Sequence, residues 1–131
     1  MHVRLTSKER RFLAQARVCR VGSADGRGAV HVAPLCHAFE PSTRTAYVAT
    51  GGKTARNLHR RPRASLECDD YFEDWDRIRG VVAYARATFV TRGPALERAR
   101  RLLRRKFAQY RDYEIDEVIA LHVERATSWG L

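Results

Sequence analysis

Three strand-like segments separated by turn signals constrain the fold of this chain more than any other feature. They cover residues 17–23, 28–39 and 44–50, and apolar and polar residues alternate in the middle segment. Asp25-Gly26 separates the first two segments, and the turn residues 40–43 separate the second from the third. Alternation marks a β-strand, and Asp-Gly is a strong hairpin signal. The sequence therefore predicts three successive antiparallel strands.

The rest of the chain predicts three further strands and three helices. The strands are expected over residues 63–69, 78–91 and 115–125, and the last is apolar on both faces, as in a strand buried on both sides. Helices are expected over residues 7–16, after a Thr6/Glu9 capping box, over 53–61, ended by Pro62, and from Pro94 through Tyr110. This order predicts one mainly β (α+β) domain over residues 1–131, with its strands in a small closed barrel.

The net charge raises the question of a nucleic-acid partner. There are 25 lysines and arginines against 15 aspartates and glutamates, so the formal charge is +10. Guanidinium groups pair well with phosphates, but charge alone does not identify the phosphate carrier. The densest cluster lies on the third helix, where a charged outer face is usually only solvated: Arg98, Arg100, Arg101, Arg104, Arg105 and Lys106. No helix-turn-helix or zinc finger is visible, so a nucleic-acid partner is disfavoured.

The motifs that the sequence lacks bear on its compartment, on metal binding and on catalysis. The first residues are charged, and no segment approaches the roughly 18 apolar residues of a membrane span. Cys19, Cys36 and Cys68 lie too far apart for a zinc motif and are expected to be reduced thiols in a cytoplasmic protein. The histidines lack metal-ligand spacing, and no catalytic triad motif is visible. We therefore expect no metal and assign no catalytic residue.

The stretch Thr50-Gly51-Gly52-Lys53-Thr54-Ala55-Arg56-Asn57 carries the clearest chemical signal. Two glycines let a ligand approach the backbone, and the following helix offers unpaired N–H groups. Lys53, Thr54 and Arg56 add two cations and a hydroxyl, which together outline a phosphate site. A nucleotide-hydrolysing P-loop is excluded because Tyr47 stands where its first glycine is required. A simple chain turn with a solvated Lys53 remains the alternative.

The same region resembles a known family. Residues 47–50, the glycine turn and residues 53–66 are similar to the pyridoxamine 5'-phosphate oxidase-like split-barrel flavoproteins. Residues 70–75, Asp-Tyr-Phe-Glu-Asp-Trp, resemble a loop in the branch that contains deazaflavin-dependent reductases. With the strand order and Trp129, the resemblance covers most of the chain.

This resemblance implies a six-stranded antiparallel split β-barrel with flanking helices, a homodimer, and a flavin or deazaflavin between the subunits. The cofactor phosphate would contact Thr50, Lys53, Thr54, Arg56 and Asn57, although relatives often carry a basic residue at the position of Thr54. The flavin ring would lie against the backbone of Val32, Pro34 and Leu35, with Trp129 nearby. His37 and Trp75 would face the substrate.

The function implied is that of an FMN-dependent oxidoreductase that transfers hydride or electrons to a small molecule. Such an enzyme needs no nucleophile, because the flavin supplies the reactive atoms. A reductase that uses deazaflavin coenzyme F-420 is the first alternative. A flavin- or haem-binding protein without turnover and a nucleic-acid-associated protein are the others.

Overall fold

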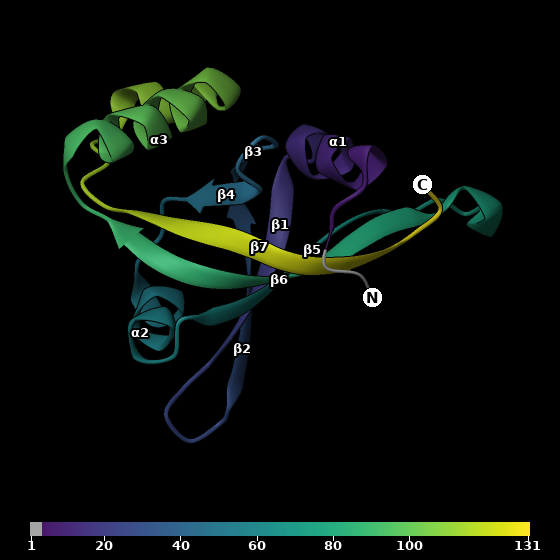
Figure 1. Ribbon diagram of the computed structural model, residues 1–131, viewed down its shortest axis with the longest axis horizontal. Coiled ribbons are helices and arrows are strands. Elements are labelled where there is room, and N and C mark those ends of the chain that lie inside the picture. The colour runs from purple at the N-terminus through teal and green to yellow at the C-terminus, as the bar shows by residue number, and fades with distance from the viewer. Residues whose placement is uncertain (1–3) are drawn as a thin grey trace.

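The computed structural model describes residues 4–131 as one curled antiparallel sheet with three helices (Figure 1). The strands run in the order β2-β1-β5-β6-β7-β4-β3. Their bounds are β1 Val18–Ala24, β2 Val30–Cys36, β3 Ala38–Glu40, β4 Thr45–Val48, β5 Arg63–Asp70, β6 Arg79–Val90 and β7 Val118–Trp129. The helices are α1 Ser7–Gln15, α2 Gly52–Arg60 and α3 Gly93–Lys106, and 3₁₀ turns cover Trp75–Arg77 and Ala108–Asp112.

The mainly β, antiparallel fold is confirmed, but the described sheet has seven strands instead of six. The single strand expected over residues 28–39 is wrong, because β2 and β3 are separate. β2 pairs with β1, whereas β3 pairs with β4 at the other edge of the sheet. Only His37 connects these two edge strands. The chain therefore passes from one edge to the other within a single residue, and this requires a curled sheet.

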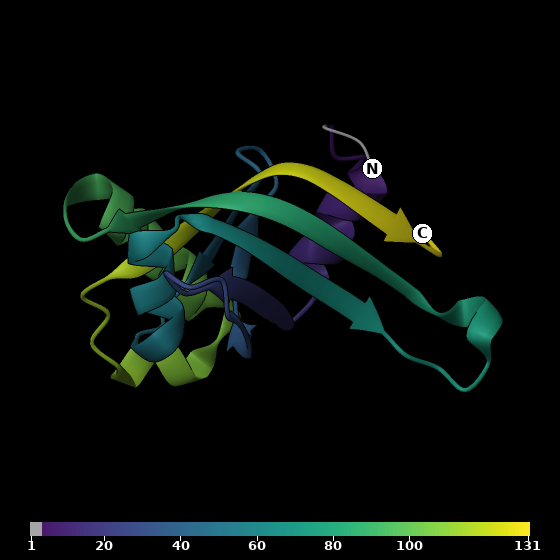
Figure 2. The ribbon, with the colours of Figure 1, turned by 90° about the horizontal axis from the view of Figure 1, so that it is seen from below.

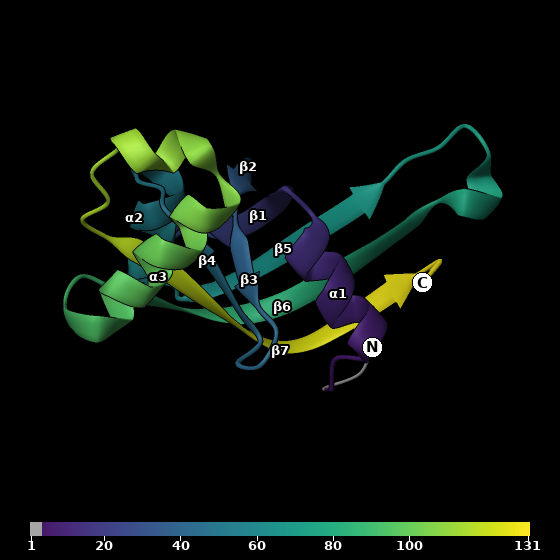
Figure 3. The same cartoon turned by 90° about the horizontal axis from the view of Figure 1, so that it is seen from above.

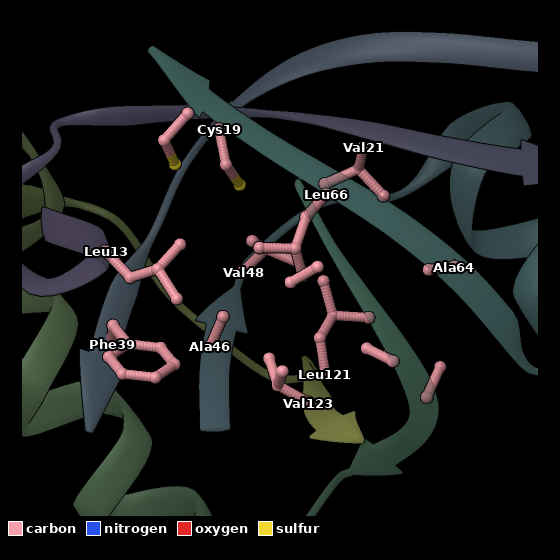
Figure 4. Close-up of a cluster of buried hydrophobic side chains, with 14 of the residues drawn as sticks. Leu13, Cys19, Val21, Phe39, Ala46, Val48, Ala64, Leu66, Leu121 and Val123 are labelled. Atoms are coloured by element: carbon pink, nitrogen blue, oxygen red, sulfur yellow. The ribbon is translucent and has the colours of Figure 1, made fainter. Parts of the chain in front are cut away.

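The main core fills the concave side of the sheet. β1, β4, β5 and β7 contribute the fully buried Val21, Val48, Leu66 and Leu121, and α1 adds Leu13 (Figure 4). Successive strand residues point to opposite faces, so alternate positions on each strand supply this core.

The first helix begins as expected. The backbone N–H of Glu9 donates to Thr6 Oγ1 over 3.1 Å, and the Thr6 N–H donates to Glu9 Oε1 over 2.8 Å. This reciprocal pair confirms the capping box and fixes where α1 starts. α1 contacts β3 and β6, α2 contacts β1 and β2, and α3 lies against β3, β4 and β7 (Figure 3).

The third helix and the last strand differ from expectation at their ends. α3 ends at Lys106 instead of continuing to Tyr110, and its Phe107 N–H donates to the Leu103 carbonyl over 2.9 Å. β7 begins at Val118 and reaches Trp129, so Trp129 lies within the last strand, four residues beyond its predicted end at residue 125. Pairing with the long β6 carries β7 beyond its apolar stretch, because Gly80 aligns with Trp129.

Most of the basic residues of α3 are used inside the molecule, so the expectation of a merely solvated face is wrong for them. Arg98 pairs with the buried carboxylate of Glu40. Three other residues donate to backbone carbonyls: Arg100 to Ile115, Arg104 to Tyr110 and Tyr113, and Lys106 to Ala16. Arg101 and Arg105 are exposed. These contacts attach the segment after α3, and also the end of α1, to the helix.

Candidate cofactor site

The turn between β4 and α2 leaves the start of the helix open. Gly51 is the N-cap residue and offers no side chain to the first N–H groups of α2. Gly52 has a φ of +62°, a value that favours glycine. A Cβ added at either glycine would have no neighbour within 4 Å. The first turn of α2 therefore presents uncapped N–H groups to open space, as an anion site requires.

The predicted phosphate contacts around this turn divide into two sets. Lys53 in the first turn of α2 and Arg56 about one turn further along have exposed side chains. Thr54 and Asn57 are buried, and Asn57 Nδ2 donates to Ser23 Oγ on β1 over 3.1 Å. Thr50 is half-buried, and its hydroxyl donates to the Gly51 carbonyl over 3.5 Å. Lys53 and Arg56 are thus free to meet an anion, whereas Asn57 anchors the helix to the sheet.

The three predicted ring contacts on β2 point to both faces of the sheet. Val32 and Pro34 are exposed, with Val32 at 65% of its full accessibility. Leu35 points inward and packs against the main core. Because α2 contacts β2, the exposed strand face and the open helix start belong to neighbouring elements.

The two tryptophans lie far from this turn in the chain's structure. Trp75 is 74% exposed in the loop joining β5 to β6, and its Nε1 donates to the Tyr71 hydroxyl over 3.3 Å. Trp129 lies at the end of β7 directly over Gly80, where an added Cβ would come within 2.3 Å of its ring. This loop and the C-terminus extend from the end of the sheet opposite α2 (Figure 2). The fold of the single chain does not bring Trp75 or Trp129 together with Lys53.

His37, expected to face the substrate, is completely buried at the break between β2 and β3. Its Nε2 donates to the Leu13 carbonyl over 2.8 Å, and its Nδ1 has no hydrogen-bond partner. Burial, and then the charge of Lys106, lower the pKa of His37 to about 4. It is therefore a neutral interior residue at neutral pH, and it links α1 to the strand break.

Protonation of His37 should destabilise the fold in mildly acidic solution. Its folded-state pKa of about 4 lies below the ordinary 6.5, so the unfolded chain takes up the proton first as the pH falls. Above about pH 6.5 His37 is neutral in both states and the free energy of unfolding is unaffected. Between about pH 6.5 and pH 4 the free energy of unfolding falls, by up to about 3 kcal/mol. Urea unfolding between pH 4 and 7 should show a weaker pH dependence in His37→Gln. His31→Gln, on the half-exposed β2 surface, is the control, and equal slopes in wild type and His37→Gln would contradict this role.

A charged group on β1 and β5 was not anticipated. Arg20 Nη1 donates to Glu67 Oε1 over 3.2 Å and to Asp69 Oδ2 over 3.3 Å. Burial raises the pKa of Glu67 to about 7, the hydrogen bond and charge of Asp69 act in the same direction, and Arg20 opposes them. The signal was available in part, because Glu67 and Asp69 are two residues apart on a strand and so share a face.

The described residues 4–131 contain no group of three or more histidine, cysteine or acidic side chains arranged to hold a metal ion. Cys19 and Cys68 are buried, and burial raises the pKa of both thiols, that of Cys19 to about 12. None of the helices in this part of the chain is long and apolar enough to cross a membrane.

Comparison with known proteins agrees with this architecture. The family model described as pyridoxamine 5'-phosphate oxidase matches residues 5–130, nearly the whole chain. None of the curated proteins compared with the chain matches it.

Solved structures with low sequence identity share the fold. A conserved hypothetical protein from Mycobacterium tuberculosis is 20% identical, with a TM-score of 0.80 over 98% of this chain and 86% of that one. An FAD-binding protein from Mesorhizobium loti is 21% identical, with a TM-score of 0.77 over 95% and 92% of the two chains. The haem storage protein HutZ from Vibrio cholerae is 14% identical, with a TM-score of 0.74 over 96% and 94%.

Proposed function

The chain belongs to the pyridoxamine 5'-phosphate oxidase family, and from this premise we propose that it is a split-barrel flavoprotein that binds FMN. We further propose that it is an oxidoreductase that transfers hydride or electrons to a small-molecule substrate. The three cysteines are free thiols, which supports a cytoplasmic location.

The open N-terminus of α2 beside Lys53 is the observation that carries this proposal. Its first N–H groups have no side-chain cap, Lys53 is exposed in the same turn, and Arg56 is exposed about one turn further along the helix. A phosphate monoester carries close to two negative charges, which the helix dipole and two cations stabilise together. Gly51 and Gly52 leave the space in which this phosphate would lie. The residues present therefore fit the phosphate end of FMN.

The remaining residues of the chain would hold and shield the cofactor. When bound, the flavin supplies the hydride or electron-pair chemistry. The exposed faces of Val32 and Pro34 would support its ring, and Leu35 would keep β2 against the core. Asn57 would hold α2 in place through Ser23, so that Lys53 stays aimed at the phosphate.

A homodimer would bring the two separated halves of the site together. In one protomer the loop carrying Trp75 and the end of β7 lie opposite α2 (Figure 2). A second copy could place its Trp75 and Trp129 near Lys53 of the first. Val18, Val30 and Val32 are 40%, 81% and 65% exposed on neighbouring strands, and an apolar surface of this kind supports a protein interface.

Two other ligands, coenzyme F-420 and haem, are the alternatives to FMN. The Trp75 loop supports deazaflavin coenzyme F-420 as the cofactor in place of FMN. One relative of the same fold is a haem storage protein, so haem binding without turnover is the second alternative. Among the described histidines, His122 bonds to Thr45 and Thr88, and His37 is buried. His59 is exposed, but its ring stacks on Phe89 and its Nε2 lies 4.0 Å from Glu117 Oε1, so His31 is the more accessible ligand for haem iron.

The absorbance spectrum of the purified protein distinguishes these possibilities. FMN, coenzyme F-420 and haem should each be titrated at low and at physiological salt. We expect FMN to bind with a Kd in the micromolar range or tighter and to shift the flavin absorbance. Tighter binding of F-420 or haem would identify that ligand, instead of FMN, as the cofactor. If none of the three binds in the micromolar range, the cofactor-binding function is refuted.

A further inference from the structure

A second cationic region lies at the other end of α2 from Lys53. It is a groove of about 550 Å³ lined by Ala24, Arg60, Arg61, Pro62, Arg63 and Arg86. Arg60 is the last residue of α2, Arg63 is the first of β5, and Arg86 lies on β6. Four arginines therefore line the groove, from the end of α2, the two-residue linker that follows it and two neighbouring strands.

The β1–β2 turn holds two of these arginines in place. Arg61 Nη2 donates to the Gly26 carbonyl over 3.0 Å. The Arg60 guanidinium lies against Gly26, where an added Cβ would be 3.0 Å from its Cζ. Pro62 restricts the backbone between Arg61 and Arg63. Because contacts with the turn already order the Arg60 and Arg61 side chains, these side chains lose little conformational entropy when a ligand binds.

The charges in the groove are poorly balanced within the described residues. No carboxylate lines it, and Glu124 reaches only Arg63, over 3.5 Å with both side chains largely exposed. Such an exposed pair contributes little. The C-terminal dipole of α2 favours Arg60, but Arg63 and Arg86 belong to the sheet.

Arg63 and Arg86 also face each other directly. They are partners in the antiparallel pairing of β5 with β6. Like charges at directly opposed positions destabilise a sheet. A bound anion would convert this repulsion into attraction, and guanidinium groups bind phosphate through two parallel hydrogen bonds.

We propose that this arginine groove binds a small ligand with two adjacent phosphate groups, such as pyrophosphate or the diphosphate of a nucleotide. Its volume is within the range of small-molecule sites. An extended nucleic acid is disfavoured, because the other large basic cluster, on α3, is mostly engaged in contacts inside the molecule. This site lies beyond the flavin function proposed above and does not depend on it.

An adjoining cavity favours a nucleotide, rather than free pyrophosphate, as the ligand that carries the two phosphates. It measures about 440 Å³, shares Ala24 and Arg63 with the arginine groove, and is lined by Val30, Tyr84 and Ala85 among others. Glu124 and Arg125 also line this cavity, and the Arg125 guanidinium lies over the Tyr84 ring at 5.2 Å. A ring attached to the diphosphate would lie beside this pair. ADP should then bind more tightly than pyrophosphate, and equal or weaker binding of ADP would identify free pyrophosphate as the ligand class.

Isothermal titration calorimetry at physiological salt with pyrophosphate, ADP and inorganic phosphate tests the proposal. Wild type should bind pyrophosphate or ADP with saturation and prefer both to inorganic phosphate. The double variant Arg60→Gln/Arg86→Gln should weaken this binding at least about tenfold, because it removes two charge-assisted contacts. Arg101→Gln/Arg105→Gln, which removes two exposed arginines on α3, should leave it within about twofold.

Two results would overturn the arginine groove as a phosphate site. One is the absence of saturable binding of pyrophosphate and ADP by wild type, whether or not duplex DNA binds. The other is equal weakening in the two double variants, which would mean that only net charge matters. FMN titration of the same proteins reports on the cofactor site separately, so failure of one proposal can be told from failure of the other.

Discussion

Replacing Lys53 by alanine is expected to weaken FMN binding at least about tenfold while the protein stays folded. A charge-assisted hydrogen bond to phosphate contributes about 1.5–3 kcal/mol, which corresponds to roughly a tenfold to hundredfold change in Kd. Lys53 is exposed in the first turn of α2, so its removal should cost binding energy and little stability. Fluorescence titration of FMN into wild type and variant measures the change.

The matched control is Lys8→Ala, which removes an exposed lysine from the first turn of α1. It lowers the net charge by the same amount and should leave the Kd for FMN within about twofold. Higher ionic strength should reduce the difference between wild type and Lys53→Ala, because salt screens exposed charges. Unchanged FMN affinity in a folded Lys53→Ala protein would remove the phosphate role from this residue.

Leu66→Ala should cause a large loss of stability, about 3 kcal/mol. Leu66 is fully buried on β5 in the main core, between strands β1 and β6 (Figure 4). Truncation removes buried methyl groups and leaves a cavity, and for leucine this costs about 2–5 kcal/mol. The free energy of unfolding from urea titration, monitored by circular dichroism, gives the value.

Tyr113→Ala is the comparison variant for this measurement. Its side chain is 65% exposed in the segment after α3, so its removal should change the free energy of unfolding by less than about 0.5 kcal/mol. Similar losses in the two variants would show that Leu66 does not occupy a tightly packed core.

The sequence was sufficient wherever local chemistry decides the structure. The Thr6/Glu9 pair placed the start of α1, and Pro62 marked the end of α2. Both signals act over three or four residues, through hydrogen bonds to the nearest backbone groups. The glycine turn before Lys53 is equally local, because backbone conformation and an uncapped helix start need no distant partner.

The sequence was insufficient wherever distant residues meet. The alternation through residues 28–39 continues past His37, yet β2 and β3 join opposite edges of the sheet. The pattern of α3 predicts a solvated basic face, because the partners of that face, the Glu40 carboxylate and the Ala16 carbonyl, are far away in the chain. Arg63 and Arg86 oppose each other only through the register of β5 and β6.

The same division applies to the candidate site. The sequence alone predicted an antiparallel, mainly β fold, the capped start of α1 and an uncapped glycine turn at Gly51 and Gly52, since each depends on the conformation of neighbouring residues. Only the tertiary structure separated Lys53 from Trp75 and Trp129, buried His37 and gathered four arginines into one groove. Periodicity specifies which face of an element is apolar, but strand pairing and sheet curvature decide which elements meet, because those contacts join residues far apart in the chain.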